Sequence, residues 1–152
     1  MRNFLLSGVA ILLAVNLTGC GRESDSKDAF EGFANTIQDK DSGYNDVLKY
    51  ATPEIVHSFM RIAIITNQAP SCEKLTTFRS LSGQDEELRK ECFKATHAST
   101  TENMKKRFEG FKIVKAEEID EGFFKLTYRV GSKDRLAQVN NIDGEWKVSR
   151  LR

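Results

Sequence analysis

The sequence predicts an α+β domain, in which N-terminal helices pack on a curved four-stranded antiparallel meander. Two observations support this prediction. Apolar residues recur with a period near 3.6 between residues 28 and 66, which is typical of helices that bury one face. From residue 111 onward the period changes to two, which is typical of strands with one buried and one wet face. Helices followed by a run of strands indicate the α+β class.

The chain begins with the parts of a secretory signal. Arg2 supplies a positive charge, and the apolar run from Phe4 to Val15 is shorter than the ~20 residues that a membrane-spanning helix needs. The motif that follows, Leu17-Thr18-Gly19-Cys20, is similar to the lipobox of bacterial lipoproteins. The resemblance implies removal of residues 1–19, a diacylglyceryl group on the Cys20 sulfur, and often an acyl chain such as palmitate on the new amine. The alternatives are an ordinary signal peptide with a chance cysteine, or an N-terminal anchor helix.

A polar segment separates the cysteine from the predicted domain. Residues 20–27 contain no large apolar side chain after Cys20, so they are interpreted as a tether to a single domain at 28–152. Seven extended residues reach at most ~25 Å, which places the domain close to the membrane surface. Gly21 follows the cysteine, and by resemblance to the sorting rule of enterobacterial lipoproteins this implies the periplasmic face of the outer membrane of a Gram-negative bacterium.

Charge and cysteine content limit the possible functions. The whole chain has a formal net charge of +1, so it has no basic field for a nucleic-acid partner. Cys72 and Cys92 remain as a pair in an exported chain, where thiols oxidise, so a disulfide is expected. It would stabilise the fold by roughly 3 kcal/mol in the chain-entropy account. A redox pair or two metal ligands are the alternatives, but no C-x-x-C motif or suitably spaced histidine supports them. No metal or cofactor is expected.

Three helices are expected before residue 67. The first is capped by Ser26 or Asp28, the second is short, and the third runs from about Pro53 to Thr66. The inward faces of the first two are formed by Phe30, Phe33, Ala34, Ile37, Tyr44, Val47, Leu48 and Ala51. The third is apolar on more than one face, which predicts that it is the most buried helix.

Residues 72–101 are expected to form a helical insertion that the Cys72–Cys92 disulfide attaches to the end of the third helix. Its inward positions would be Leu75, Phe78, Leu88, Cys92 and Ala95. A separate short helix at 102–109 would carry a small basic patch, Lys105 to Arg107, interpreted as a solvated face or a contact with lipid headgroups.

Four strands are expected at Phe111–Ile119, Phe123–Val130, Leu136–Asn141 and Trp146–Leu151. Turns are predicted at 120–122 and 131–134, and Asp143-Gly144 is a two-residue hairpin signal. In the second strand, one face is expected to carry Phe124, Leu126, Tyr128 and Val130, and the other Phe123, Lys125, Thr127 and Arg129. The first of these faces should pack against the helices.

Two stretches resemble the nuclear-transport-factor-2-like (cystatin-like) superfamily. Residues 29–55, AFEGFANTIQDKDSGYNDVLKYATPEI, are similar to its opening, and residues 140–151, NNIDGEWKVSRL, are similar to its last hairpin. The resemblance implies a cone, in which a curved sheet wraps around a long helix and leaves a cavity at the wide end. Some members carry out isomerase, hydratase or epoxide-hydrolase chemistry, whereas others only bind, and many pair through the open sheet face. The helical insertion departs from the usual pattern.

No stretch of the sequence states a specific activity. His57, Tyr50 and Tyr128 are the candidates for lining the cavity, although each can equally be a packed side chain, and His97 is expected to be exposed. No set of residues suits catalysis, so a non-catalytic binding module of the envelope is expected. Its partners would be the membrane, through lipid on Cys20, and another envelope protein or a small ligand, with a homodimer through the sheet face as a further option. The alternatives are small-ligand binding in the cone cavity, an inhibitor or immunity lipoprotein, and an isomerase or hydratase-type enzyme.

Overall fold

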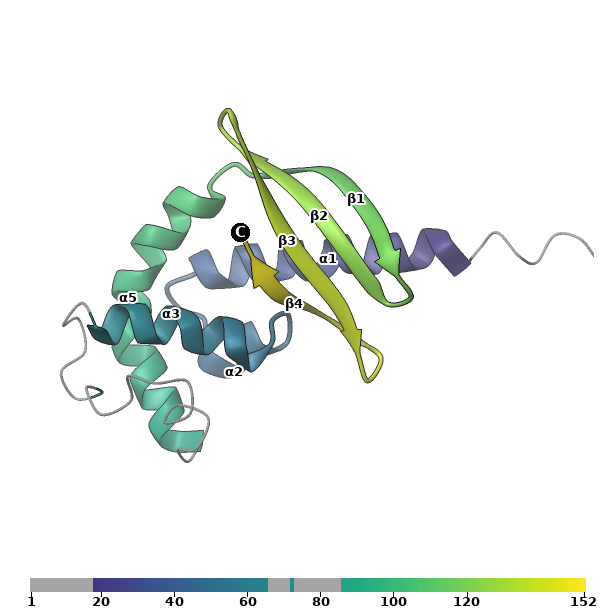
Figure 1. Ribbon diagram of the computed structural model, residues 1–152. Helices are drawn as coiled ribbons and strands as arrows, with labels where there is room; N and C mark the ends of the chain where they lie inside the picture. The colour runs from purple at the N-terminus through teal and green to yellow at the C-terminus, as the bar shows by residue number, and fades with distance from the viewer. Residues whose placement is uncertain (1–17, 66–71, 73–85) are drawn as a thin grey trace, which may run out of the picture.

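The computed structural model describes residues 18–65, 72 and 86–152 (Figure 1). The elements are α1 (Thr18–Gln38), α2 (Tyr44–Leu48), α3 (Pro53–Ile65), α5 (Glu86–Phe108), β1 (Lys112–Asp120), β2 (Phe123–Val130), β3 (Lys133–Ile142) and β4 (Glu145–Leu151). The strands form one antiparallel sheet in the order β1-β2-β3-β4. In Figure 1, α1 crosses one face of this sheet, while α2, α3 and α5 gather beside it. The predicted α+β class is therefore confirmed.

The strands agree closely with the alternating pattern. Phe124, Leu126 and Tyr128 are buried on the inner face, as expected. The turn between β2 and β3 is tighter than expected, because only two residues separate these strands and Gly131 has a positive φ of 59°. At the last hairpin, Asp143 and Gly144 have φ values of 53° and 89°, which are those of a type I′ turn.

The core lies between α1 and the sheet. Phe30 and Phe33 of α1 are completely buried, and their rings meet Phe108 at centroid distances of 6.1 and 5.7 Å. As predicted, α3 has the largest buried share among the described helices, with seven of its 13 residues buried, although Ile62 and Ile65 are 58% and 61% exposed. Since α3 packs beside the sheet rather than across it, only one of its apolar faces is covered.

The start of α1 also differs from the prediction. The helix includes residues 21–27, which were expected to be extended, and neither Ser26 nor Asp28 caps it. Ser26 is fully buried within the helix, and its hydroxyl donates to the Glu23 carbonyl oxygen at 2.9 Å. Arg22 pairs with Glu118 and Glu121 across the β1–β2 turn at 3.6 and 3.3 Å. These contacts with the sheet thus stabilise helical structure N-terminal to the apolar residues of α1.

α5 is one helix of 23 residues, not two shorter ones. Its buried face is largely polar and includes Thr96, His97, Thr100 and Thr101, whereas Ala95 is exposed, contrary to the prediction. The three threonine hydroxyls donate to carbonyl oxygens four residues earlier at 2.8–2.9 Å, so their burial leaves no hydroxyl without a partner. The basic residues 105–107 lie in its last turn, where positive charge favours a helix end.

The predicted disulfide is present between Cys72 and Cys92, with their Cα atoms 5.8 Å apart. The other residues expected to lead into the insertion, including Leu75 and Phe78, lie outside the described residues, as do residues 1–17 of the expected signal. Within the described ranges, no helix is both long and apolar enough to cross a membrane.

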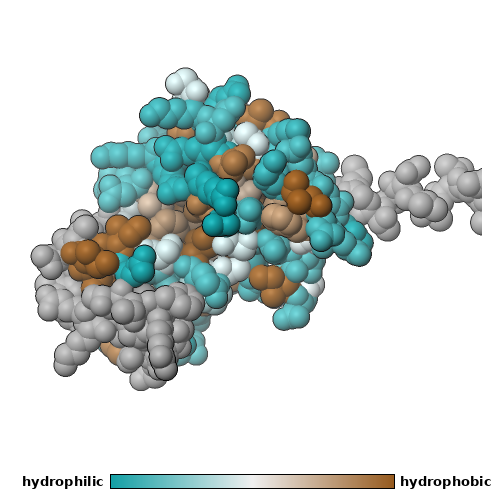
Figure 2. Space-filling model, in the orientation of Figure 1, coloured by the Kyte–Doolittle hydropathy of each residue, from teal (hydrophilic) through white to brown (hydrophobic). Residues whose placement is uncertain are grey.

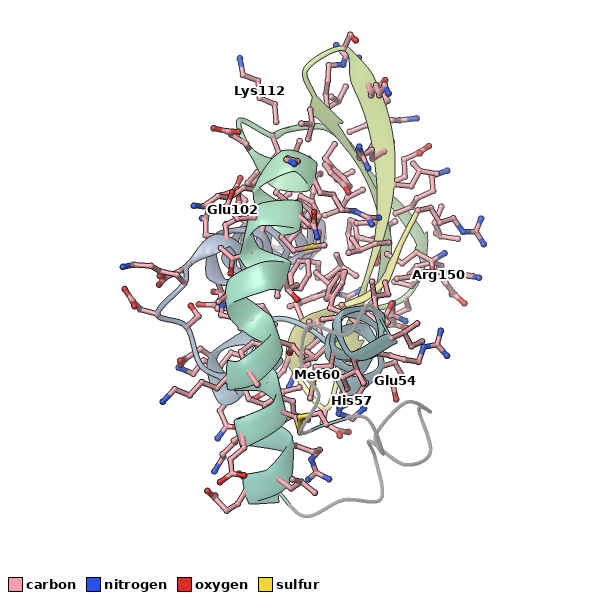
Figure 3. All side chains as sticks on the ribbon, turned by 90° about the vertical axis from the view of Figure 1, so that its left-hand side faces the viewer. Glu54, His57, Met60, Glu102, Lys112 and Arg150 are labelled. Atoms are coloured by element: carbon pink, nitrogen blue, oxygen red, sulfur yellow. A yellow bond between two sulfur atoms is a disulfide. The ribbon has the colours of Figure 1, made fainter. Side chains whose placement is uncertain are left out.

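The outer face of the sheet is mostly polar, with single apolar side chains among the charged ones (Figure 2). Glu117 lies between Lys115 and Lys125 and pairs with both, and Arg129 pairs with Asp134 through two hydrogen bonds of 2.6 and 3.1 Å. Arg150 also points away from the helices on this side (Figure 3). Two copies that met through this face would bring charged side chains together, which is unlike the apolar surface typical of stable homodimers.

Candidate functional site

The three residues expected to line one cavity lie in three separate places. Tyr128 is completely buried, with its ring 4.7 Å from that of Phe30 and 5.7 Å from that of Phe108. Its hydroxyl has no hydrogen-bond partner among the described atoms. Tyr50 lines one cleft and His57 lines another. The structure therefore brings none of these three side chains together in a shared cavity.

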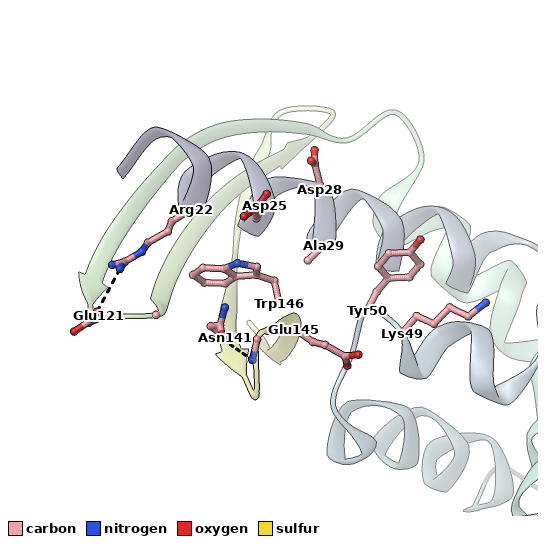
Figure 4. A pocket seen from close by; sticks show the side chains of 12 residues that line it. Arg22, Asp25, Asp28, Ala29, Lys49, Tyr50, Glu121, Asn141, Glu145 and Trp146 are labelled. Atoms are coloured by element: carbon pink, nitrogen blue, oxygen red, sulfur yellow. Dashed lines mark hydrogen bonds and ion pairs between the residues drawn. The ribbon is translucent and has the colours of Figure 1, made fainter. Parts of the chain in front are cut away.

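Tyr50 belongs to a cleft of about 930 Å³ at the N-terminal end of α1, which we call the α1–hairpin cleft (Figure 4). The first turns of α1 form one wall, and the β1–β2 turn and the β3–β4 hairpin form the other. Its principal side chains are those of Arg22, Asp25, Asp28, Tyr50, Glu121 and Trp146. Segments about 120 residues apart in the sequence thus meet here, because α1 crosses the sheet beside these turns.

Two half-buried aromatic rings shape the α1–hairpin cleft. Trp146 packs edge-on against Phe124 with ring centroids 5.5 Å apart, which fixes the indole at the start of β4. The ring of Tyr50 lies directly against Gly32 of α1, where even a Cβ atom would overlap it. Only glycine leaves room for the ring in this position.

Most charges in the α1–hairpin cleft are paired within the chain. Arg22 pairs with Glu121, Lys49 pairs with Asp46 at 2.9 Å, and Glu145 pairs with Lys147 at 2.8 Å. Asp25 and Asp28 have no ion-pair partner in the part of the chain that the structure describes. Both line the cleft from α1, and in Figure 4 Asp25 lies above the Trp146 ring, whereas the carboxylate of Asp28 points away from Trp146 and Tyr50. The charge left over in the cleft is therefore negative, which suits a cationic group.

His57 lies on α3 in a hollow facing the N-terminal half of α5 (Figure 3). Its Nε2 is 2.9 Å from the Tyr44 hydroxyl, and the two rings are stacked. Burial lowers the pKa of His57, and the nearby positive charge of Arg89 lowers it further. Burial also raises the pKa of the Tyr44 hydroxyl, although Arg89 opposes this rise. The pair is therefore neutral near pH 7, and its hydrogen bond joins α2 to α3.

His97 is buried rather than exposed, contrary to the prediction. Only 3% of it is accessible, and its Nε2 lies 2.7 Å from the carbonyl oxygen of Asp39. Since α5 continues through this region, residue 97 is turned toward the α1–α2 loop instead of lying in a solvated insertion.

Sequence reasoning missed the role of three side chains in the α1–hairpin cleft. The sequence predicts an extended tether around Asp25, a cap at Asp28, and no role for Trp146 beyond the start of the last strand. The available signal was the hairpin motif Asp143-Gly144-Glu145-Trp146, which places an aromatic ring directly after a tight turn. No pattern in the sequence shows that the start of α1 lies opposite this hairpin.

Comparisons with known proteins add no functional assignment to this geometry. No protein-family model, curated protein or solved structure matches the chain. In the described residues, no group of three or more His, Cys, Asp or Glu side chains is arranged to hold a metal ion.

Proposed function

We propose that this chain is a lipid-anchored lipoprotein of the bacterial envelope, and that it acts as a non-catalytic binding module whose α1–hairpin cleft holds a cationic group of its partner. One observation carries the proposal: Asp25 and Asp28, without ion-pair partners in the described chain, line the same cleft as the rings of Trp146 and Tyr50. Carboxylates attract cations directly, and the faces of indole and phenol rings attract them through the ring quadrupole. The partner would present a lysine, arginine or other amine.

The position of α1 supports an anchored arrangement. Cleavage between Gly19 and Cys20 would leave Cys20 in the first turn of α1, since the helix extends from Thr18. At 1.5 Å per residue, Asp25 and Asp28 lie about 8 and 12 Å beyond Cys20 along the helix axis. A lipid on this cysteine would hold the α1–hairpin cleft near the headgroups. The periplasmic face of the outer membrane, inferred from Gly21, is part of the same proposal.

The lining of the α1–hairpin cleft favours binding over acid–base chemistry. Both histidines of the chain lie elsewhere, His57 between α2 and α3 and His97 under the α1–α2 loop. The cone-like arrangement of the nuclear-transport-factor-2-like superfamily also remains a proposal. Its support is the order of the elements, with a long helix crossing a meander that ends in the Asp143-Gly144 hairpin.

Anchoring is tested by Cys20→Ser. The variant is expected to lose incorporation of a labelled palmitate analogue and to leave the membrane fraction, because the thiol that carries the diacylglyceryl group is gone. Continued presence in the membrane fraction would contradict the lipoprotein proposal.

Binding at the α1–hairpin cleft is tested by the emission of Trp146, which is the only tryptophan of the chain. Titration with trilysine is expected to change this emission to saturation. Asp25→Asn combined with Asp28→Asn should raise the dissociation constant about tenfold, since each removes an exposed charge contact worth up to ~1 kcal/mol. Glu31→Gln, an exposed acid of α1 outside the cleft, is the matched control and should change it less than twofold. Equal effects of the two changes would contradict the proposed site.

A further inference from the structure

A second hollow lies beyond the C-terminal end of α1, about 30 Å from Thr18 along the helix axis. It opens between the α1–α2 loop and the middle of α5, has a volume of about 600 Å³, and is called the distal pocket below. This volume is within the range of small-molecule sites, which combine an apolar lining with a few polar groups.

The floor of the distal pocket is aromatic. Tyr44, Phe93 and His97 are all buried and all line it. The rings of Phe93 and His97 stack with centroids 4.6 Å apart, and Tyr44 meets Phe93 edge-on at 5.8 Å. Rings fixed by mutual packing present a rigid apolar surface, which suits a planar ring of a ligand.

The charge left over in the distal pocket is positive. Lys90 pairs with Glu86 and Glu87, which do not line the pocket, and Asp46 pairs with Lys49, so both of these lining charges have partners within the chain. Lys40 and Lys94 also line the pocket, and neither has an ion-pair partner among residues 18–65, 72 and 86–152. Against these two cations stands the single carboxylate of Asp41. A ligand with one negative charge would therefore be attracted.

His97 provides an independent indication of a ligand. Its Nε2 donates to the carbonyl oxygen of Asp39 at 2.7 Å, which commits that nitrogen to the protein. Its Nδ1 is buried and has no hydrogen-bond partner in the described part of the chain. Because the proton is on Nε2, Nδ1 is left as an acceptor, and since buried polar atoms are almost always hydrogen-bonded, it needs a donor from outside the described part of the chain.

We infer that the distal pocket binds a small organic anion with a planar apolar ring, of the class of aromatic carboxylates. The ring packs on the Tyr44–Phe93–His97 floor, the carboxylate is attracted by Lys40 and Lys94, and Nδ1 of His97 accepts a hydrogen bond from a hydroxyl or N–H group on the ring. This site is separate from the α1–hairpin cleft and does not depend on a lipid at Cys20.

The test titrates 2-naphthoate and its uncharged analogue 2-naphthamide into the purified full-length chain in detergent, with ligand-detected NMR and empty micelles as the blank. The anion is expected to bind more tightly than the amide. Lys40→Gln combined with Lys94→Gln should raise the dissociation constant for 2-naphthoate about tenfold and leave that for 2-naphthamide unchanged. Lys106→Gln, an exposed lysine elsewhere on α5, is the matched control and should have no effect.

A second variant fills the distal pocket. Ala98 lines it and is exposed, so Ala98→Phe should abolish binding of both compounds without disturbing the core. Unchanged emission of Trp146, at the other end of α1, would confirm that the variant is folded. The inference is overturned if 2-naphthoate does not bind, if both compounds bind equally, or if folded Ala98→Phe still binds them.

Discussion

The two ends of α1 carry sites of opposite character. The α1–hairpin cleft lies between the start of α1 and two turns of the sheet. Its charged groups without an ion-pair partner in the described chain are the carboxylates of Asp25 and Asp28. The distal pocket has a buried aromatic floor, and its corresponding charges include the two cations of Lys40 and Lys94. Yet the formal net charge of the chain is only +1. Net charge therefore describes the long-range field of this domain but not its sites, because ion pairs cancel charge at some places and leave it at others.

The two aromatic floors also differ in their relation to the core. Phe93 is 4% exposed and packs between Tyr44 and His97, so it is part of the fold as well as of the distal pocket. Trp146 is half-buried and packs against Phe124 at the edge of the core. Substitutions in the floor of the distal pocket should therefore lower the free energy of unfolding more than substitutions in the α1–hairpin cleft.

The largest expected effect distinguishes these two floors. Phe93→Ala should lower the free energy of unfolding by about 3 kcal/mol, because it leaves a cavity among buried rings. Trp146→Ala should lower it by less, about 2 kcal/mol, since the indole is only partly buried and already has some contact with water. Urea unfolding followed by circular dichroism measures both variants. Equal losses would show that the cleft floor belongs to the core, which contradicts the comparison.

An intermediate effect is expected at Gly32, where the Tyr50 ring lies against α1. Alanine normally stabilises a helix interior by up to ~1 kcal/mol relative to glycine. Gly32→Ala should instead destabilise by about 1 kcal/mol, because the new Cβ overlaps the ring and displaces it from the α1–hairpin cleft. In a Tyr50→Ala background the same change should become stabilising. Gly21→Ala, with open space around it, is the control and should not destabilise.

That reversal of sign is the decisive part of the Gly32 experiment. If Gly32→Ala has the same effect with and without the Tyr50 ring, then the contact between them does not determine the shape of the α1–hairpin cleft.

The smallest expected effect is a pH dependence near the distal pocket. Burial holds the pKa of His57 below its ordinary value, so the folded protein binds fewer protons than the unfolded chain once the pH falls below ~6.5. The stabilising contribution of neutral His57 is fully present above that pH and is lost as the pH falls toward the lowered pKa. Between pH 7.5 and 5, His57→Gln should therefore lose less stability than the unaltered protein. Parallel urea-midpoint curves for the two proteins would contradict this assignment.

The sheet and the apolar face of α1 could be predicted because their information is local. Alternation places Phe124, Leu126 and Tyr128 on one face, and Asp143-Gly144 has the φ values of the turn that its sequence favours. The disulfide between Cys72 and Cys92 could likewise be inferred from the number of cysteines.

The sites could not be predicted, because they depend on contacts between distant segments. Arg22 extends α1 by pairing with acids of the β1–β2 turn, and this places Asp25 opposite Trp146. On α5, Thr96 and its neighbours look like solvated residues in sequence, but their hydroxyls bond within the helix and allow burial beside His97. The periodicity of apolar residues in the sequence predicts neither the position of Asp25 opposite Trp146 nor the burial of these threonines.

One measurement tests the opposite charge preferences of the two ends directly: the dissociation constants of trilysine and 2-naphthoate for the same two double variants. Asp25→Asn with Asp28→Asn should raise the dissociation constant of trilysine about tenfold and leave that of 2-naphthoate unchanged. Lys40→Gln with Lys94→Gln should raise the dissociation constant of 2-naphthoate and leave that of trilysine unchanged. If both double variants weaken the binding of both compounds, or if neither variant weakens the binding of either, the ends of α1 do not hold two separate sites of opposite charge.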